Sequence, residues 1–476
     1  MNDFVNNIKK VMLVFLIFFI ALISYITYIY MFNSEKAVSS TFNSRLWAER
    51  NKVLRGTIYD KDLKPLTKST KISEVSQKQQ YLQGAVFAHA IGYMNPIYGL
   101  SGLEKKYDKE LMGAGDTAVL NFFSLNKKEE EKIGNGLRTT LDSELQKKAF
   151  DLLGDKRGAV VAMDPKTGEI LAMVSKPSYN PNNLAKNWKE IVANKDVPLL
   201  NRTISGLYPP GSIFKTIIAI SALENIPNVY NKSLQDNGKL IVNGKTLLNN
   251  YDGEVLGNLD FRTAYMHSSN VYFGSLGLDI GNKAMLETAE KFYFNKNMPA
   301  VGLTIDNSRF PSYKSNEKGN IAQSAIGQAE VLATPMEMAL VASTVANDGI
   351  MMEPMLVKEI LDSKGKSLEK IEPKRLEEMM SKENALIMKD LMKGVVAEGT
   401  GTSAAVTGIV VCGKTGTADH KADASKQNAP HSWFIGFAPY ENPQIAIAVI
   451  VEEGGVGGGI AARITRELIK TYLKAK

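Results

Sequence analysis

YPPGSIFK, the stretch from Tyr208 to Lys215, decides the fold because its rigid Pro-Pro-Gly turn leads directly into an apolar helix. The isoleucine-rich run 217–223 that follows has the spacing of a buried helix. We therefore expect Ser212 at the N-terminus of that helix. Lys215 comes three positions later, so it shares a helix face with Ser212 and reaches its hydroxyl. The positive end of the helix dipole favours an alkoxide forming there.

The bare pattern Ser-x-x-Lys carries little weight on its own. Other matches begin at Ser124, Ser315, Ser363 and Ser367. These lie in polar, charge-rich stretches with no apolar helix behind them, so the context singles out Ser212. A serine needs a base to act as a nucleophile near neutral pH. Lys215 can be that base if burial and a second cation, for which Lys414 is the candidate, lower its pKa.

Two further motifs supply the other groups that acyl transfer needs. In Ser268-Ser269-Asn270, the first serine can relay a proton and the asparagine offers an amide donor and acceptor to a peptide, whereas Ser269 has a structural role. The other motif is Lys414-Thr415-Gly416-Thr417, which follows a strand-like run, 406–412. Lysine and threonine suit a carboxylate, and glycine lets an extended substrate approach the backbone closely. Together the three motifs predict an acyl-transfer site.

In this order the motifs resemble the signature of penicillin-binding proteins and serine β-lactamases. Other segments look like landmarks of the class B penicillin-binding proteins, so the resemblance covers nearly everything after residue 32. These segments are 55–60, 101–104, 164–165, 201–202, 327–328, 334–335, 399–401 and 433–436.

The resemblance implies an α/β (α+β) fold of the serine transpeptidase and β-lactamase kind. It would have an antiparallel five-stranded sheet with helices on both faces, and an all-helical subdomain. The sequence pattern agrees with this expectation. Apolar runs at 158–163 and 169–174 predict a hairpin, 432–437 and 444–451 predict two more strands, and 460–472 predicts a C-terminal helix. Strands near both ends of the domain indicate a sandwich closed by its terminal segments.

An apolar run at 11–32 is long enough to cross a bilayer, since its 22 residues would extend about 33 Å as a helix. A cleaved signal peptide is the alternative, because 37–39 resembles a small-x-small site. The run exceeds the core of about 7 to 15 residues that such peptides have, so we favour a retained anchor. We predict a cytoplasmic tail (1–10), a transmembrane anchor (11–32), a mixed α+β pedestal or linker domain (33–137) and a transpeptidase domain (138–476).

By resemblance, Ser212 attacks the carbonyl of the penultimate D-alanine, Lys215 accepts its proton, and Ser268 helps to protonate the leaving D-alanine. The resemblance assigns the donor peptide to Asn270 and its terminal carboxylate to the 414–417 motif, in which Lys414, Thr415, Gly416 and Thr417 bind substrate. The backbone N–H groups of Ser212 and Thr417 would form an oxyanion hole. No metal or organic cofactor is expected.

Charge and cysteine content exclude several other classes. The net charge of +7 is dispersed among nearly as many acids, which argues against nucleic acid as a partner. The single cysteine, Cys412, excludes an intrachain disulfide and CxxC zinc modules. A metal site built from Cys412, Asp419, His420 and His431 stays open as a minor alternative. A Ser-His-Asp enzyme is disfavoured because the chain has no G-x-S-x-G elbow.

The main expectation is a wall-building transpeptidase that cross-links peptidoglycan stem peptides and is acylated by β-lactam antibiotics. A D,D-carboxypeptidase, a β-lactamase and a non-catalytic β-lactam sensor are the alternatives. The resemblance also implies a polytopic glycan polymerase of the shape, elongation, division and sporulation type as a partner. Because stem peptides lie outside the cell, we expect a single-pass protein of the cell membrane with a cytoplasmic N-terminus and an extracytoplasmic catalytic domain. The charges flanking the anchor do not decide this orientation.

Overall fold

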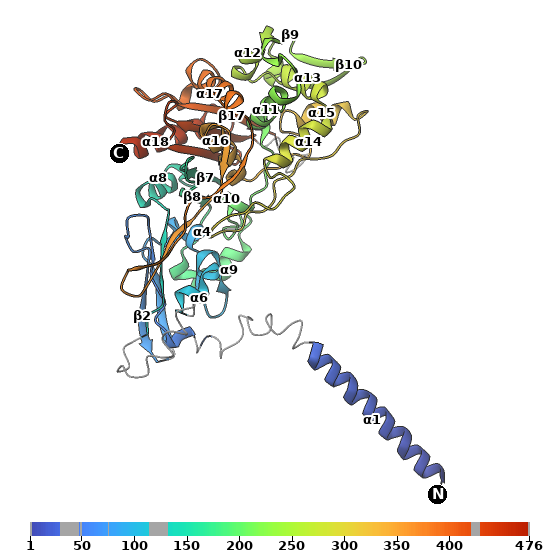
Figure 1. Cartoon of the computed structure of the whole chain (residues 1–476), viewed down its shortest axis with the longest axis vertical. Coiled ribbons are helices and arrows are strands. Elements are labelled where there is room, and N and C mark those ends of the chain that lie inside the picture. The colour runs from blue at the N-terminus through green and yellow to red at the C-terminus, as the bar shows by residue number, and fades with distance from the viewer. Residues whose placement is uncertain are drawn as a thin grey trace.

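The computed structural model describes residues 2–28, 47, 50–74, 76–113, 132–419 and 429–474. Among these residues, one helix is long and apolar enough to cross a membrane, the stretch Val5–Tyr28 of α1 (Asn2–Tyr28). It stands apart from the rest of the chain (Figure 1) and fits a single-pass membrane anchor. The helix begins before residue 11, the predicted start of the span. Lys9 and Lys10 are good helix formers, so the helix continues beyond its apolar part in this direction. Residues 29–32, the site at 37–39 and His420 lie outside the described residues.

A five-stranded antiparallel sheet forms the centre of the C-terminal part, in the order β17-β18-β19-β7-β8. The terminal segments of the domain meet where β19 pairs with β7, with Val449 opposite Val160. This confirms the predicted sheet. The strands are β7 (Gly158–Met163), β8 (Ile170–Lys176), β17 (Cys412–Ala418), β18 (His431–Ala438) and β19 (Ile445–Val451).

The position of β17 corrects one expectation. The apolar run 406–412 predicted a strand before the Lys-Thr-Gly-Thr motif, but the strand starts at Cys412 and contains the motif itself. Residues Val406 and Ile409 instead face each other across a tight turn. Pairing with β18 along its whole length makes this polar segment a strand.

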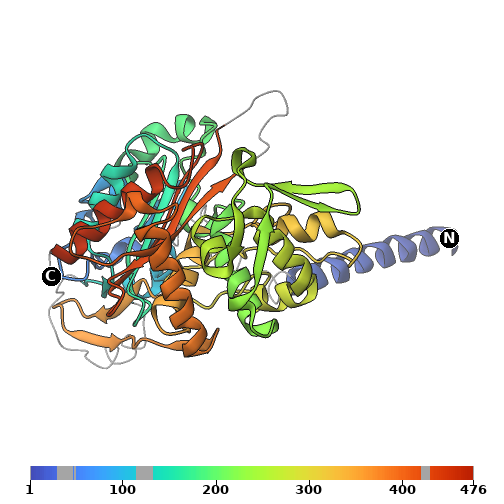
Figure 2. The ribbon, with the colours of Figure 1, turned by 90° about the horizontal axis from the view of Figure 1, so that it is seen from above.

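Helices cover both faces of the sheet, as Figure 2 shows. Successive side chains of β7 point to opposite faces of the sheet and pack into two different hydrophobic cores. Val161 packs in the core that contains α16, and Val160 packs in the core that contains α8 and α18. The Asp142 side chain caps α8 by accepting hydrogen bonds from two backbone N–H groups. The covering helices are α8 (Ser143–Leu153), α16 (Pro335–Ala346), α17 (Lys382–Ala397) and α18 (Ile460–Lys474).

A mainly helical region lies beside the sheet and carries the first two motifs. It also contains two short antiparallel pairs, one closed by the turn Asn243-Gly244, in which both residues have positive φ. Its helices are α11 (Lys215–Asn225), α12 (Phe261–Met266), α13 (Asn270–Ile280), α14 (Asn282–Lys291) and α15 (Lys318–Ser324). Its strands are β9 (Ser233–Asp236), β10 (Lys239–Val242), β11 (Lys245–Asn249) and β12 (Gly257–Asp260).

The described residues of the predicted pedestal (33–137) form strands and short helices at the opposite end of the folded part from the helical region (Figure 1). Its centre is a buried ion pair in which Arg55 contacts Glu104 and also Asp108, at 2.7 Å. Residues 357–370 join it, because β14 and β15 extend the sheet that begins with β1 and β6. The pedestal elements are β1 (Ile58–Tyr59), β2 (Thr67–Ser73), β3 (Ser76–Tyr81), β4 (Met94–Asn95), β5 (Gly99–Leu100), α4 (Ala88–Ile91), α5 (Gly102–Lys106) and α6 (Asp108–Leu111).

The remaining elements connect these parts. They are β6 (Gly136–Thr139), β13 (Ile350–Met352), β14 (Val357–Leu361), β15 (Ser367–Lys370), β16 (Arg375–Glu378), α9 (Leu184–Ala193) and α10 (Arg202–Ser205). Since β14 and β15 cross from one part to the other, the division at residue 137 remains a prediction.

Candidate active site

Ser212 lies in a 3-10 turn, η4 (Gly211–Phe214), that leads into α11. Backbone hydrogen bonds fix the turn: Tyr208 exchanges two with Ala333, and Gly211 donates to Gly327 at 2.9 Å. Gly211 has a φ of +56°, and a Cβ atom there would come within 2.6 Å of the Thr417 carbonyl oxygen. The turn that carries Ser212 is therefore packed directly on β17.

The Tyr208 side chain anchors the same turn from the other side. Its hydroxyl donates to Glu452 at 2.7 Å, and Glu452 also accepts from the buried Arg202 at 2.6 Å. The indole of Trp433 donates to Pro209 O at 3.1 Å and meets the Tyr208 ring edge-on. Residues of two landmark segments, 201–202 and 433–436, thus fix the position of Tyr208 and Pro209, which precede Ser212.

Lys215 is fully buried and joins the first motif to the second. Its Nζ donates to Ser268 O at 2.6 Å, to Ser268 Oγ at 3.1 Å and to Asn270 Oδ1 at 2.7 Å. Burial lowers the pKa of Lys215 well below its ordinary value, and the nearby positive charge of Lys414 lowers it further. Asp236 opposes these effects only in part. Both effects favour the neutral amine that a base requires.

The second motif occupies the sharp connection between α12 and α13, where Ser268 has a φ of +60°. Ser269 is the N-cap of α13 and donates its hydroxyl to Asp236 at 2.6 Å, so its predicted structural role is confirmed. Asn270 donates its amide to Asn249 O at 2.9 Å, and its backbone N–H donates to Asn250 at 2.8 Å. Hydrogen bonds with Lys215, Asn249 and Asn250 therefore fix the orientation of Asn270.

The third motif lies on β17, an edge strand of the sheet. Side chains alternate along it, so Thr415 and Thr417 line a cavity while Lys414 is buried behind them. Burial lowers the pKa of Lys414 to about 7. A Cβ atom on Gly416 would lie 2.9 Å from Ile213 and 3.0 Å from Pro210 O, which explains why glycine occurs there.

One cavity of about 710 Å³ gathers the three motifs. The predicted site residues that line it are Ser212, Ser268, Asn270, Thr415 and Thr417, whereas Lys215, Lys414 and Gly416 pack behind this wall. No sequence pattern marked Asp236, Asn249 or Asn250 as supports of the second motif, and Thr400 was named only within a landmark segment. Thr400 lines the cavity, and its hydroxyl lies 2.6 Å from that of Thr415.

The geometry disfavours the alternative metal site. Cys412 and His431 stand at opposite ends of the β17–β18 pair, since His431 lies opposite Ala418. Six residues of strand separate them, about 20 Å at ~3.3 Å per residue. Among the described residues no group of His, Cys, Asp and Glu side chains could hold a metal ion. His420 lies outside them.

Comparison with known proteins agrees with this geometry. The family described as penicillin binding protein transpeptidase domain matches residues 158–470, and the penicillin binding protein A dimerisation domain matches 55–137. The peptidoglycan D,D-transpeptidase PbpA of Mycolicibacterium smegmatis is 33% identical over 420 residues, which are 83% of this chain and 84% of that protein. The MrdA transpeptidase of Acinetobacter baumannii is 29% identical over 84% of this chain and 66% of its own length.

Solved structures lead to the same family. The ceftriaxone acyl-enzyme complex of penicillin-binding protein A from Mycobacterium tuberculosis is 30% identical, with a TM-score of 0.82 over 90% of this chain and 100% of that one. Penicillin-binding protein 2 of Pseudomonas aeruginosa is 28% identical, with a TM-score of 0.74 over 89% of this chain and 96% of that one. The chain therefore belongs to the penicillin-binding protein family, and it is a class B peptidoglycan D,D-transpeptidase.

Proposed function

We propose that Ser212 is the nucleophile of this transpeptidase and that Lys215 is its general base. Three acceptors surround the Lys215 amine, which is the number of protons that a charged lysine donates. When the amine is neutral it has a lone pair instead of the third proton, and it can accept the Ser212 proton. The supporting observation is that this buried amine contacts Ser268 and Asn270, which line the same cavity as Ser212.

The reaction then proceeds in two acyl transfers. Ser212 Oγ forms a bond to the carbonyl carbon of the penultimate D-alanine while its proton passes to Lys215. The amide C–N bond breaks, and the departing D-alanine amine takes that proton through the Ser268 hydroxyl, which lies 3.1 Å from the lysine. An acceptor amine attacks the resulting ester, gives up a proton by the same path and releases Ser212. Backbone N–H groups of Ser212 and Thr417 stabilise the oxyanion in both steps.

The donor peptide binds along β17 as an additional strand, because an edge strand offers free backbone groups to an extended chain. Its carboxylate is held by the Thr415 and Thr417 hydroxyls above the Lys414 charge, and Asn270 contacts its amide. β-Lactam antibiotics carry a carboxylate beside a reactive amide, so they enter by the same contacts and acylate Ser212.

Mass spectrometry after a pulse of benzylpenicillin tests the nucleophile. We expect one covalent adduct on the peptide that contains Ser212, and none in the Ser212→Ala protein. The Lys215→Met protein keeps an apolar side chain of similar length, and we expect its acylation to slow by about 100-fold or more. An adduct that persists in the Ser212→Ala protein overturns the assignment.

We also propose that the N-terminus is cytoplasmic, that the catalytic domain lies outside the membrane, and that anchor and pedestal contact a polytopic glycan polymerase. Stem peptides are presented on the outer side, which supports this orientation. Cys412 is buried, so a cysteine introduced by Lys109→Cys at an exposed position would be the one reactive thiol. We expect a membrane-impermeant maleimide to label it in intact spheroplasts, and protection until lysis would reverse the orientation.

A further inference from the structure

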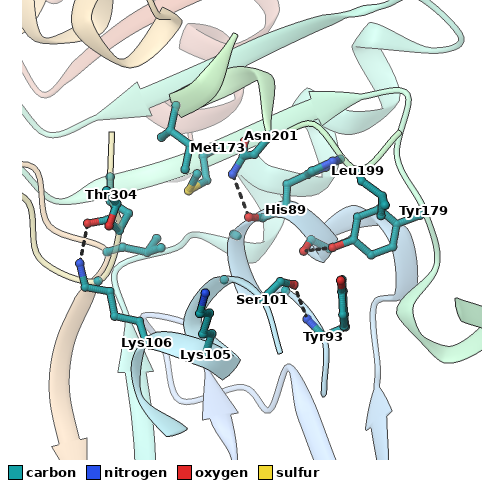
Figure 3. Close-up of a pocket in the computed structure, with 18 residues that line it drawn as sticks. His89, Tyr93, Ser101, Lys105, Lys106, Met173, Tyr179, Leu199, Asn201 and Thr304 are labelled. Carbon is teal, nitrogen blue, oxygen red and sulfur yellow. Dashed lines mark hydrogen bonds between the residues drawn. The ribbon is translucent and has the colours of Figure 1, made fainter. Parts of the chain in front are cut away.

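A second cavity, drawn in Figure 3, lies where the pedestal meets the transpeptidase part, and Ser212 is not among its lining residues. Its volume is about 500 Å³, which suits a ligand of small-molecule size. The pedestal side is formed by α4, α5 and the residues between them. The other side is formed by β8, α10 and the segment before it, residues 302–304, and Leu356, which precedes β14. A ligand bound here would contact both parts of the protein.

The charged groups of the lining are basic. Lys105 and Lys106 are part of it, and among its described residues there is no aspartate or glutamate. The acids adjacent to these lysines are already paired, Glu104 with Arg55 and Asp108 with Arg50 and Arg55. The positive charge at the cavity is therefore not compensated by its neighbours.

The two ammonium groups differ in their contacts. Lys106 Nζ donates to Leu303 O at 2.6 Å, and partial desolvation lowers the pKa of this largely exposed side chain, with no acid nearby to raise it. Lys105 has neither a hydrogen bond nor an ion pair with any described residue, and Figure 3 shows its side chain pointing into the cavity. An anion between them would provide the missing partner.

Apart from the hydroxyl groups of Tyr93 and Thr304, the rest of the lining is apolar or already hydrogen-bonded. His89 contacts Pro198 O at 2.8 Å, and burial lowers its pKa to about 4, so it adds no charge near neutral pH. Tyr179 and Ser101 are occupied by backbone groups of α4 and Tyr93. Met173, Leu199 and Ile204 provide an apolar surface opposite the lysines. The ligand that fits is an anion with an apolar body.

We propose that this junction cavity is a second binding site for short acyl peptides that end in a free carboxylate. The carboxylate would lie between Lys105 and Lys106, and the acyl part against Met173, Leu199 and Ile204. The identity of the ligand rests on the proposed function, since the reaction consumes and produces such peptides. The site itself depends only on the charge and shape of the cavity.

Isothermal titration of the full chain in detergent tests the site, with Nα,Nε-diacetyl-L-lysyl-D-alanine and its C-terminal amide as probes. The protein is first treated with benzylpenicillin to occupy the catalytic cavity, and its mass is measured in the same sample. We expect saturable binding of the acid and at least about tenfold weaker binding of the amide. Lys105→Gln should weaken binding of the acid by a similar factor, whereas Lys109→Gln, an equal charge change on the following helix α6, should leave it unchanged.

The outcomes separate this proposal from the catalytic one. A missing penicillin adduct contradicts the role of Ser212 without bearing on the junction cavity, and titration of the Ser212→Ala protein then gives the same test. The proposal is overturned if the acid does not bind, if acid and amide bind equally, or if Lys105→Gln and Lys109→Gln behave alike. A melting temperature equal to that of the unsubstituted protein establishes that the Lys105→Gln protein is folded.

Discussion

The hydroxyl groups of Thr400 and Thr415 lie 2.6 Å apart at the wall of the catalytic cavity. The backbone N–H of Thr400 donates to Met266 O at 3.3 Å, so this residue connects the strand of the third motif to the helix before the second. Thr400 thereby sets the direction in which the Thr415 hydroxyl can serve a substrate carboxylate.

We predict that Thr400→Val lowers the second-order rate constant for benzylpenicillin acylation by about 2- to 10-fold. The estimate follows from the loss of one neutral hydrogen bond, about 0.5 to 1.5 kcal/mol. Thr400→Ser keeps the hydroxyl and should restore most of the rate. An unchanged acylation rate in the Thr400→Val protein would show that the Thr400 hydroxyl has no effect on acylation and that the residue contributes only to packing.

The pH dependence of acylation should have two limbs. Lys215 acts as a base only without its proton, so the rate rises with pH through its lowered pKa. Lys414 attracts a carboxylate only with its proton, and burial lowers its pKa to about 7, so binding weakens above about pH 7. We expect a bell-shaped profile for benzylpenicillin. The methyl ester of benzylpenicillin has no carboxylate, so its acylation rate should not decrease above about pH 7. A decrease as large as that for benzylpenicillin would exclude Lys414 as the cause.

Gly211 and Gly154 form a matched pair for testing the turn that carries Ser212. Their φ angles are +56° and +57°, but only at Gly211 would a Cβ atom meet another group, the Thr417 carbonyl oxygen at 2.6 Å. Gly154→Ala should lower the free energy of unfolding by about 1 to 2 kcal/mol and leave acylation unchanged. Gly211→Ala should destabilise the protein more and slow acylation, because Ser212 must move away from β17. If Gly154→Ala and Gly211→Ala have equal effects on the free energy of unfolding, measured by chemical denaturation, and on the acylation rate, this prediction is wrong.

Glu337 is a buried carboxyl group whose Oε1 has no hydrogen-bond partner among the described residues. Burial raises its pKa well above the ordinary value of 4.5. The folded state therefore binds a proton that the unfolded state releases above about pH 4.5, and stability decreases as pH rises from there towards the raised pKa. We predict that Glu337→Gln removes this decrease, so that the difference in melting temperature between variant and unsubstituted protein grows from pH 5 to pH 8. A constant difference over this range would contradict the prediction.

The strands of the central sheet could be predicted from the sequence because each apolar run is buried on both faces. The runs 158–163 and 444–451 agree with β7 and β19 to within a residue. β17 could not be placed this way, since Lys414, Thr415 and Gly416 have no strand pattern and become a strand only by pairing with β18. The hairpin at Asn243-Gly244 had a usable signal, because this dipeptide favours a tight turn between strands.

The meeting of the three motifs was predictable from the sequence, whereas their catalytic roles remain a proposal. Ser212, Ser268, Asn270, Thr415 and Thr417 were expected together from the order and chemistry of their motifs, and they line one cavity. Their supports were not predictable, because Asp236, Asn249 and Thr400 come from hairpins and connections that meet the motifs only through tertiary packing. No local pattern marks such residues.

One short stretch of backbone joins the two cavities. Asn201 donates to His89 O of the pedestal at 3.0 Å, the next residue is tied through Glu452 to Tyr208, and the chain then reaches Ser212. Because each step in this path is a hydrogen bond or a short run of backbone, a displacement of His89 would be passed on to the turn that carries Ser212.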